Sequence, residues 1–246
     1  MIRSAFKKGP VFVAYLTIGD GGLDYSLESA LALESGGVDL LEIGIPFSDP
    51  VADGPVIQKA MQRALEGGAK LADVITFIEQ LRRHSQIPLV LFTYYNPVFQ
   101  GGEKFLQEAR QAGADGILIL DQPCEEAEQN ILDQVFIVSP STTQERLSKI
   151  ARQSRGFLYY VCQKGVTGVR QNLPAFVADD LKKIKNIART PVVAGFGISE
   201  RGMAKEILRH ADGFVVGSYF VQEMGKRASP EKLSQLAIAI DPRREL

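Results

Sequence analysis

Gly116-Ile117-Leu118-Ile119-Leu120-Asp121 is a short apolar run that ends in a carboxylate. Four consecutive large apolar residues leave no polar face, so a strand formed here would be buried on both sides. A strand is buried in this way when helices cover the outside of a parallel sheet and packed side chains fill the inside. The run therefore predicts a parallel sheet that is enclosed by helices.

Similar runs recur along the chain, and segments with helical spacing of their apolar residues separate them. With the first run there are eight: Val11 to Gly19, Asp39 to Pro46, Pro88 to Tyr95, Gly116 to Asp121, Gln134 to Pro140, Gly156 to Cys162, Pro191 to Ile198 and Gly213 to Phe220. Eight strand-helix units in 246 residues are typical of an α/β protein with a single (β/α)8 TIM barrel. A doubly wound open sheet is the alternative. The sequence offers no obvious linker, so we expect one domain over residues 1–246.

Two places in this barrel should be unusual. The segment between Asp121 and Gln134 is too short for a full crossover helix, which predicts a thinly covered corner. The chain also begins close to the first strand, so little sequence is left to close the bottom of the barrel.

The composition excludes several classes of partner. A formal net charge of −1 and evenly scattered charges give no basic stripe for nucleic acid or a membrane surface. The apolar run Val11 to Leu16 follows Arg3, Lys7 and Lys8, as in a signal peptide, but no small-residue cleavage site comes after it. No segment reaches the roughly 20 apolar residues of a membrane helix. These observations predict a soluble, cytoplasmic protein.

The chain is poorly supplied with metal ligands and with nucleophile-histidine pairs. It contains only two cysteines, Cys124 and Cys162, and two histidines, His84 and His210, both in arginine-rich stretches. This favours a reducing compartment and argues against a disulfide framework, a zinc site or a serine-histidine mechanism. We therefore expect chemistry based on carboxylates, hydroxyls and backbone amides.

The second strand carries an ionisable residue in an otherwise apolar run. Alternation places Leu40, Glu42 and Gly44 on one face, and the missing side chain of Gly44 leaves room beside the carboxylate. A buried carboxylate needs a partner, or its pKa rises until it can donate and accept a proton near neutrality. Glu42 is therefore the candidate general acid-base. Pairing with an interior lysine, or an outward orientation, is the alternative.

The loop after this strand contains two aspartates. Asp53 precedes Pro55, which suits the first turn of a helix, so from the residues alone Asp53 is most simply a helix-cap residue. Asp49 lies between Ser48 and Pro50 and is most simply a turn former.

Two late strands end in glycine. Ala194 to Ser199 follows the seventh strand and Val216 to Ser218 follows the eighth. In barrels the loops after these strands bind phosphate through bare backbone amides. We expect such a site at these two strand ends.

Aromatic residues end several strands. Tyr159 and Tyr160 point to opposite faces of their strand, so one of them should reach the barrel interior. Tyr15, Tyr94 and Phe196 could wall a pocket for a flat aromatic substrate, although core packing explains each of them equally well.

The stretch Leu41 to Pro55 closely resembles the signature of the tryptophan synthase alpha-subunit family. The resemblance extends in the right order through Tyr15 to Asp20, Gly165 to Gly168, Gly195 to Ser199 and Gly217-Ser218. It implies a barrel that cleaves indole-3-glycerol phosphate to indole and glyceraldehyde 3-phosphate by a retro-aldol reaction without a cofactor.

The resemblance also implies roles for individual residues. Glu42 would move protons at the indole C3 and the glycerol hydroxyl, and Asp53 would hold the indole N–H. Tyr159 would lie beside the glutamate. Phosphate would bind at Gly168, Gly197, Gly217 and Ser218. Tyr15, Phe196 and Thr167 are further candidates for the substrate site, and Thr167 is available to hydrogen-bond Asp53 in the closed state.

A pyridoxal-phosphate beta subunit is the partner that the resemblance implies, in an alpha2-beta2 heterotetramer that receives the indole. The loop with Asp49 and Pro50 would lie near that partner. The polar, glycine-rich loop Gln163 to Arg170 could close as a lid, but Cys162-Gln163-Lys164 stands where well-known members have Ser-Arg-Ala. A weak enzyme that mainly activates a beta subunit and a free-standing indole-releasing lyase remain alternatives.

Overall fold

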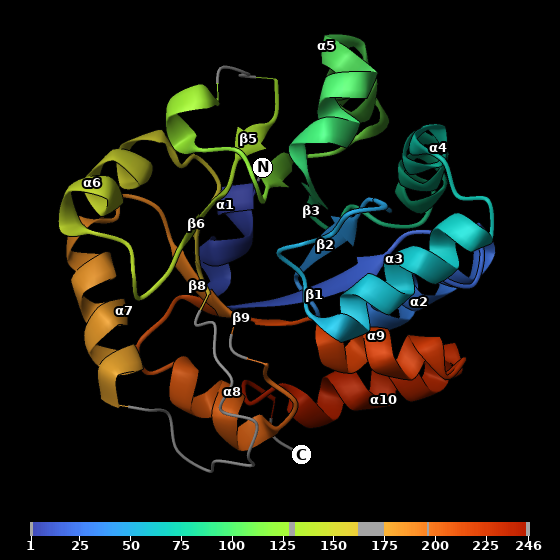
Figure 1. The fold of residues 1–246 in the computed structure, drawn as a ribbon. Helices are drawn as coiled ribbons and strands as arrows, with labels where there is room; N and C mark the ends of the chain where they lie inside the picture. The colour runs from blue at the N-terminus through green and yellow to red at the C-terminus, as the bar shows by residue number, and fades with distance from the viewer. Residues whose placement is uncertain (1, 128–130, 162–174, 196, 245–246) are drawn as a thin grey trace.

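Each of the eight predicted strand segments contains a strand in the computed structural model, which describes residues 2–127, 131–161, 175–195 and 197–244 (Figure 1). The strands are β1 (Val11–Thr17), β2 (Leu40–Gly44), β3 (Leu89–Thr93), β4 (Gly116–Ile119), β5 (Asp133–Gln134), β6 (Phe136–Val138), β7 (Leu158–Val161), β8 (Val192–Gly195) and β9 (Gly213–Val216). They form one parallel sheet in the order β5-β4-β3-β2-β1-β9-β8-β7-β6.

Helices surround this sheet. They are α1 (Ile2–Ala5), η1 (Phe6–Lys8), α2 (Leu23–Ser35), α3 (Pro55–Glu66), α4 (Leu71–Arg82), α5 (Tyr95–Ala112), η2 (Cys124–Glu126), α6 (Gln144–Gln153), α7 (Ala175–Ile187), α8 (Arg201–Ile207), α9 (Ser218–Gly225) and α10 (Pro230–Ile240). None of the helices in the described part of the chain is both long enough and apolar enough to cross a lipid bilayer.

The barrel closes where the fifth predicted strand changes partner. Gln134 to Pro140 was expected to form one strand, but β5 pairs with β4 whereas β6 pairs with β7. Val135 separates them, and its N–H donates to the Ile117 carbonyl at 2.9 Å. The prediction of a TIM barrel is thus confirmed, whereas the prediction of eight strands is wrong by one.

Side chains of the barrel alternate between two apolar clusters. Leu41 and Ile43 of β2 belong to the large cluster between the sheet and the helices, and Leu40 belongs to the smaller interior cluster. Tyr159 of β7 lies in the interior cluster and Tyr160 in the outer one. The predicted two-residue period therefore holds on both strands.

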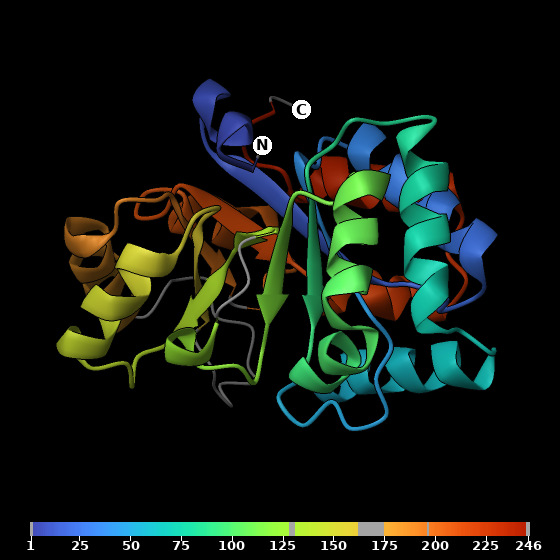
Figure 2. The ribbon, with the colours of Figure 1, turned by 90° about the horizontal axis from the view of Figure 1, so that it is seen from above.

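Short elements cover both the corner after β4 and the bottom of the barrel. Between β4 and β5 the described residues include only the single 3-10 turn η2, which confirms the thin cover. At the opposite end from the loop after β2, α1 lies across the barrel (Figure 2). Its Ile2 is fully buried, and a Cβ on Gly156 would lie 2.9 Å from the Ile2 Cδ1 atom. One short helix turn thus helps to fill the bottom of the barrel.

Candidate active site

Glu42 is a buried carboxyl group without an ion-pair partner among the described residues. It lies in β2 and is 1% exposed, and neither carboxylate oxygen has a hydrogen-bond partner among the described residues. Because burial disfavours the charged form, it raises the pKa of Glu42 from 4.5 to about 8. Neither alternative for Glu42 holds within the described residues, because the side chain faces inward and meets no lysine.

This raised pKa makes the stability of the protein depend on pH in one direction. Below pH 4.5 Glu42 is protonated whether the chain is folded or not, so the contribution of this group to stability has its full value. Between pH 4.5 and about 8 only the unfolded chain loses this proton, so the free energy of unfolding falls as the pH rises, by up to about 5 kcal/mol.

The variant Glu42→Gln has no titratable proton at this position, so its stability should lack this pH dependence. Urea unfolding of both proteins at about pH 5 and about pH 9 should show the variant gaining stability over the native chain as the pH rises. A difference that does not change with pH would contradict the raised pKa.

Two tyrosines lie beside Glu42. Tyr15 of β1 is its register partner across the strand pair, and its hydroxyl lies 3.3 Å from Thr17 Oγ1. Burial raises the pKa of Tyr15, with a smaller contribution from the Asp53 charge; burial and then the Glu42 charge raise the pKa of Tyr159. Both phenols therefore remain protonated and able to donate hydrogen bonds.

Glycines make space for these two phenols. A Cβ on Gly44 would overlap the Tyr15 hydroxyl, and one on Gly195 would lie 2.5 Å from the Tyr159 hydroxyl. The room that Gly44 was predicted to leave beside the carboxylate is thus filled by a tyrosine.

Asp53 is held by a hydrogen bond and does not cap the following helix. The N-cap residue of α3 is Gly54, and no side chain caps this helix. Tyr94 donates from its hydroxyl to Asp53 Oδ2 at 2.7 Å, and the same hydroxyl accepts from the Ala52 N–H at 3.1 Å. Burial raises the pKa of Asp53, and the hydrogen bond from Tyr94 partly opposes this. The interpretation of Asp53 as a cap residue is therefore wrong.

The sequence did not reveal that Tyr94 binds Asp53. The sequence predicts a pocket wall or a core residue for Tyr94; its ring is fully buried, but its hydroxyl also reaches the neighbouring loop. The available signal was a hydroxyl at the end of β3, directly beside β2 in the sheet.

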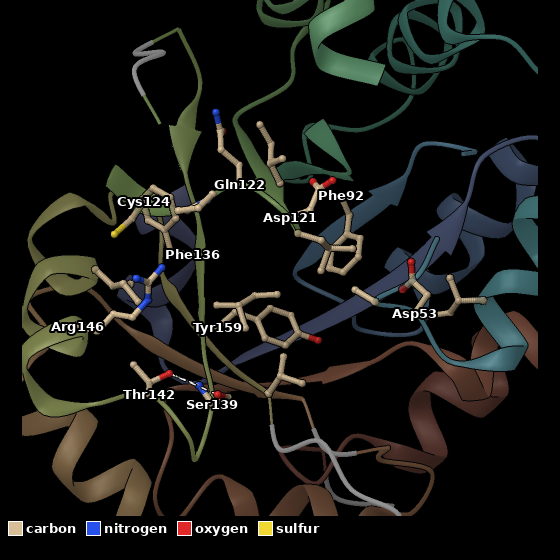
Figure 3. A pocket seen from close by; sticks show the side chains of 18 residues that line it. Asp53, Phe92, Asp121, Gln122, Cys124, Phe136, Ser139, Thr142, Arg146 and Tyr159 are labelled. Atoms are coloured by element: carbon tan, nitrogen blue, oxygen red, sulfur yellow. Dashed lines mark hydrogen bonds between the residues drawn. The ribbon is translucent and has the colours of Figure 1, made fainter. Parts of the chain in front are cut away.

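Asp53 and Tyr159 face one cavity of about 520 Å³ at the carboxyl ends of the strands (Figure 3). Most of its wall is apolar: Ile57, Phe92, Ile119, Leu120, Phe136, Ile137, Ile150 and Val161. Glu42 is not part of the lining but is close enough to Tyr159 for its charge to raise the pKa of that phenol. The arrangement suits a flat apolar ligand that presents one polar N–H or O–H to Asp53.

The candidate phosphate residues lie at the ends of β8 and β9. Gly217 is the N-cap of α9, which has no side-chain cap, so the first amides of this helix are open to an anion. Gly197 has a φ of +62°, a backbone conformation that favours glycine. Thr167, Gly168, Phe196 and the loop Gln163 to Arg170 lie outside the described residues.

No group of three histidine, cysteine or carboxylate side chains that could hold a metal ion occurs in the described ranges.

Comparison with known proteins agrees with this geometry. The sequence profile of a family described as "Tryptophan synthase alpha chain" matches residues 2–242. This chain belongs to the tryptophan synthase alpha chain family. That family is the indole-3-glycerol-phosphate lyase component of tryptophan synthase.

Individual members of the tryptophan synthase alpha chain family match almost the whole length of this chain. The tryptophan synthase alpha chain of Coxiella burnetii is 50% identical over 98% of this chain and 97% of its own length. That of Chlamydia caviae is 47% identical over 98% of both chains. A solved structure of the tryptophan synthase α2β2 complex from Pyrococcus furiosus contains a chain that is 38% identical, with a TM-score of 0.89, covering 94% of this chain and 98% of that one.

Proposed function

We propose that this chain cleaves indole-3-glycerol phosphate to indole and glyceraldehyde 3-phosphate, with Glu42 as the acid-base group and Asp53 as the group that binds the indole N–H. The single observation that carries the assignment is the buried Glu42 carboxyl, which has no hydrogen-bond partner in the part of the chain that the structure describes and lies next to a cavity lined by Asp53. A pKa of about 8 keeps Glu42 mainly protonated at neutrality, ready to donate first and accept afterwards.

The reaction then needs two proton transfers and one bond cleavage. Glu42 donates its proton to the indole C3, which leaves the carboxylate and a positively charged ring. It next accepts the proton of the glycerol hydroxyl next to C3 as the carbon-carbon bond breaks and the aldehyde forms. The bonding electrons return to the ring, which becomes indole, and Glu42 regains its proton. Proton transfer requires hydrogen-bond reach, so the side chain must approach the cavity when substrate binds.

Asp53 stabilises the positive charge that develops on the indole ring during these steps. Protonation at C3 makes the indole N–H more acidic, and a carboxylate beside it stabilises the charged ring. The Tyr94 hydroxyl holds one oxygen of Asp53 at 2.7 Å and leaves the other for the substrate. Tyr159 and Tyr15 are neutral donors beside Glu42 and would stabilise its carboxylate between the two transfers.

The phosphate of the substrate is assigned to Gly197, Gly217 and Ser218. Glycerol phosphate should bind to the native protein and slow hydrogen exchange at these amides, and protection elsewhere would place the anion in another position. Among the described residues, a Cβ on Gly217 would meet Tyr15 alone, at an ordinary distance of 3.5 Å, so an added methyl group is compatible with the fold there. We expect Gly217→Val to weaken binding at least about tenfold, the effect of losing one hydrogen bond to an anion. Gly202→Val is the matched control, because a Cβ on Gly202 meets no atom within 4 Å.

A beta subunit is proposed as the partner, in an α2β2 assembly. Val51, Tyr95 and Phe99 are exposed apolar side chains near the active site. Val51 belongs to the same loop as Asp53, and the other two lie in the first turns of α5, directly after Tyr94. A partner on this face would contact the segments that hold Asp53 and could favour their active arrangement.

Indole release from indole-3-glycerol phosphate, measured with and without a beta subunit, tests this proposal. We expect slow release by the chain alone and faster release when the partner is added. Full activity without partner would favour the free-standing lyase. No release under either condition, together with activation of the partner, would favour the weak allosteric subunit and contradict the proposal.

A further inference from the structure

Asp20 and Arg63 form a bidentate ion pair outside the cavity. The Arg63 Nε atom donates to Asp20 Oδ1 at 2.8 Å, and Nη2 donates to Oδ2 at 2.7 Å. Asp20 is 3% exposed, so an unpaired charge there would be costly. Neither residue lines the cavity, and the proposed mechanism does not use them.

The pair joins segments that carry three parts of the active site. Asp20 follows β1, which holds Tyr15. Arg63 lies in the last turn of α3, whose first residue comes two positions after Asp53. The guanidinium also packs against α9, since a Cβ on Gly225 would lie 2.8 Å from Arg63 Nη2. Helix α9 begins at the candidate phosphate residue Ser218, and Figure 1 shows it alongside α3.

The packing around this pair is tight. A Cβ on Gly19, the neighbour of Asp20, would lie 2.8 Å from the Ala69 Cβ atom, just beyond the end of α3. The loop after β1 therefore touches the end of α3 directly, and movement of that end would be transmitted along the helix. A helix is stiff over its length, so fixing its last turn also limits where its first turn and the preceding Asp53 can lie.

We propose that Arg63 is a positioning residue that fixes α3 against β1 and α9 and thereby holds Asp53 in its catalytic position. This inference rests on the proposed function, because it needs Asp53 to act on the substrate. Loss of the pair should lower kcat for indole release by about tenfold to a hundredfold, as expected when a catalytic group is misplaced by about an ångström. The KM should change little, because Arg63 contacts no substrate.

A double-mutant cycle tests the coupling. The rate of indole release is measured for the native chain, Arg63→Met, Asp53→Asn and the double variant, with folding of each checked by circular dichroism. If Arg63 acts through Asp53, its substitution should cost little once Asp53 is already replaced. Arg63→Lys keeps the charge but not the bidentate contact with Asp20, so it should give an intermediate rate of indole release. It also allows the cycle to be run if Arg63→Met does not fold.

Arg82→Met is the matched control. Arg82 also ends a barrel helix, α4, and pairs with a buried aspartate, Asp115, at 3.4 Å, but it does so before β4 at the opposite end of the barrel. Its effect, if any, should be the same with or without Asp53→Asn. Equal losses for the Arg63 variant in both backgrounds would overturn its positioning role. A normal rate for Asp53→Asn alone would instead overturn the proposed function.

Discussion

Glu42→Gln is expected to lower kcat for indole release by about 10² to 10⁴, the usual contribution of general acid-base catalysis. Glutamine has nearly the same shape as a protonated glutamic acid, which is the form that burial favours at this position. It can neither deliver a proton to the indole C3 nor accept one from the hydroxyl. The fold should therefore survive while the chemistry is lost.

Binding measurements separate this expectation from a structural effect. The Gln variant should bind glycerol phosphate as the native protein does, because the candidate phosphate residues Gly217 and Ser218 follow a different strand. Near-normal turnover by the folded variant would show that Glu42 is not the acid-base group.

Asp53→Asn should reduce kcat by about 10² or more, comparable to the loss of one preorganised electrostatic contact in a dry site. The amide is neutral and cannot balance the charge on the indole ring. Because Gly54, not Asp53, is the N-cap of α3, the substitution should cost little stability. Thermal unfolding and indole release, measured together, check both statements.

Tyr94→Phe provides the companion variant for Asp53. It keeps the carboxylate but removes the hydrogen bond at 2.7 Å. Its rate should fall by less than that of Asp53→Asn, and adding it to Asp53→Asn should have little further effect. An unchanged rate for Asp53→Asn would remove Asp53 from the mechanism.

The position of Glu42 could be predicted because strand geometry leaves few choices. The two-residue period decides which face a residue occupies, and a lone glutamate among leucine and isoleucine in β2 had to be buried. The same period predicted that one of Tyr159 and Tyr160 faces the interior, and the structure shows that it is Tyr159. Length alone predicted the thin corner after β4, because so few residues remained for a helix.

Other features depend on contacts between segments that lie far apart in the sequence, so no single segment predicts them. Val135 lies in a continuous apolar run, and only the partner strands decide that pairing changes there. Asp53 and Gly54 are both acceptable N-caps, so a shift of one residue determined whether Asp53 was free for chemistry. The hydroxyl of Tyr94 reaches a loop 41 positions away along the chain, which no local pattern predicts. The roles of Glu42 and Asp53 in a particular reaction came from family resemblance, not from periodicity.

Titration of the Glu42 carboxyl is the most direct test of its role as the acid-base group. The side-chain carboxyl carbons can be labelled with carbon-13 and followed by NMR across the pH range, and the Glu42 signal can be assigned by its loss in Glu42→Gln. We predict a midpoint near 8, with the carboxyl mainly protonated at neutral pH. A midpoint near the ordinary value of 4.5 would mean a carboxylate at neutral pH, and this would contradict its proposed role as the initial proton donor.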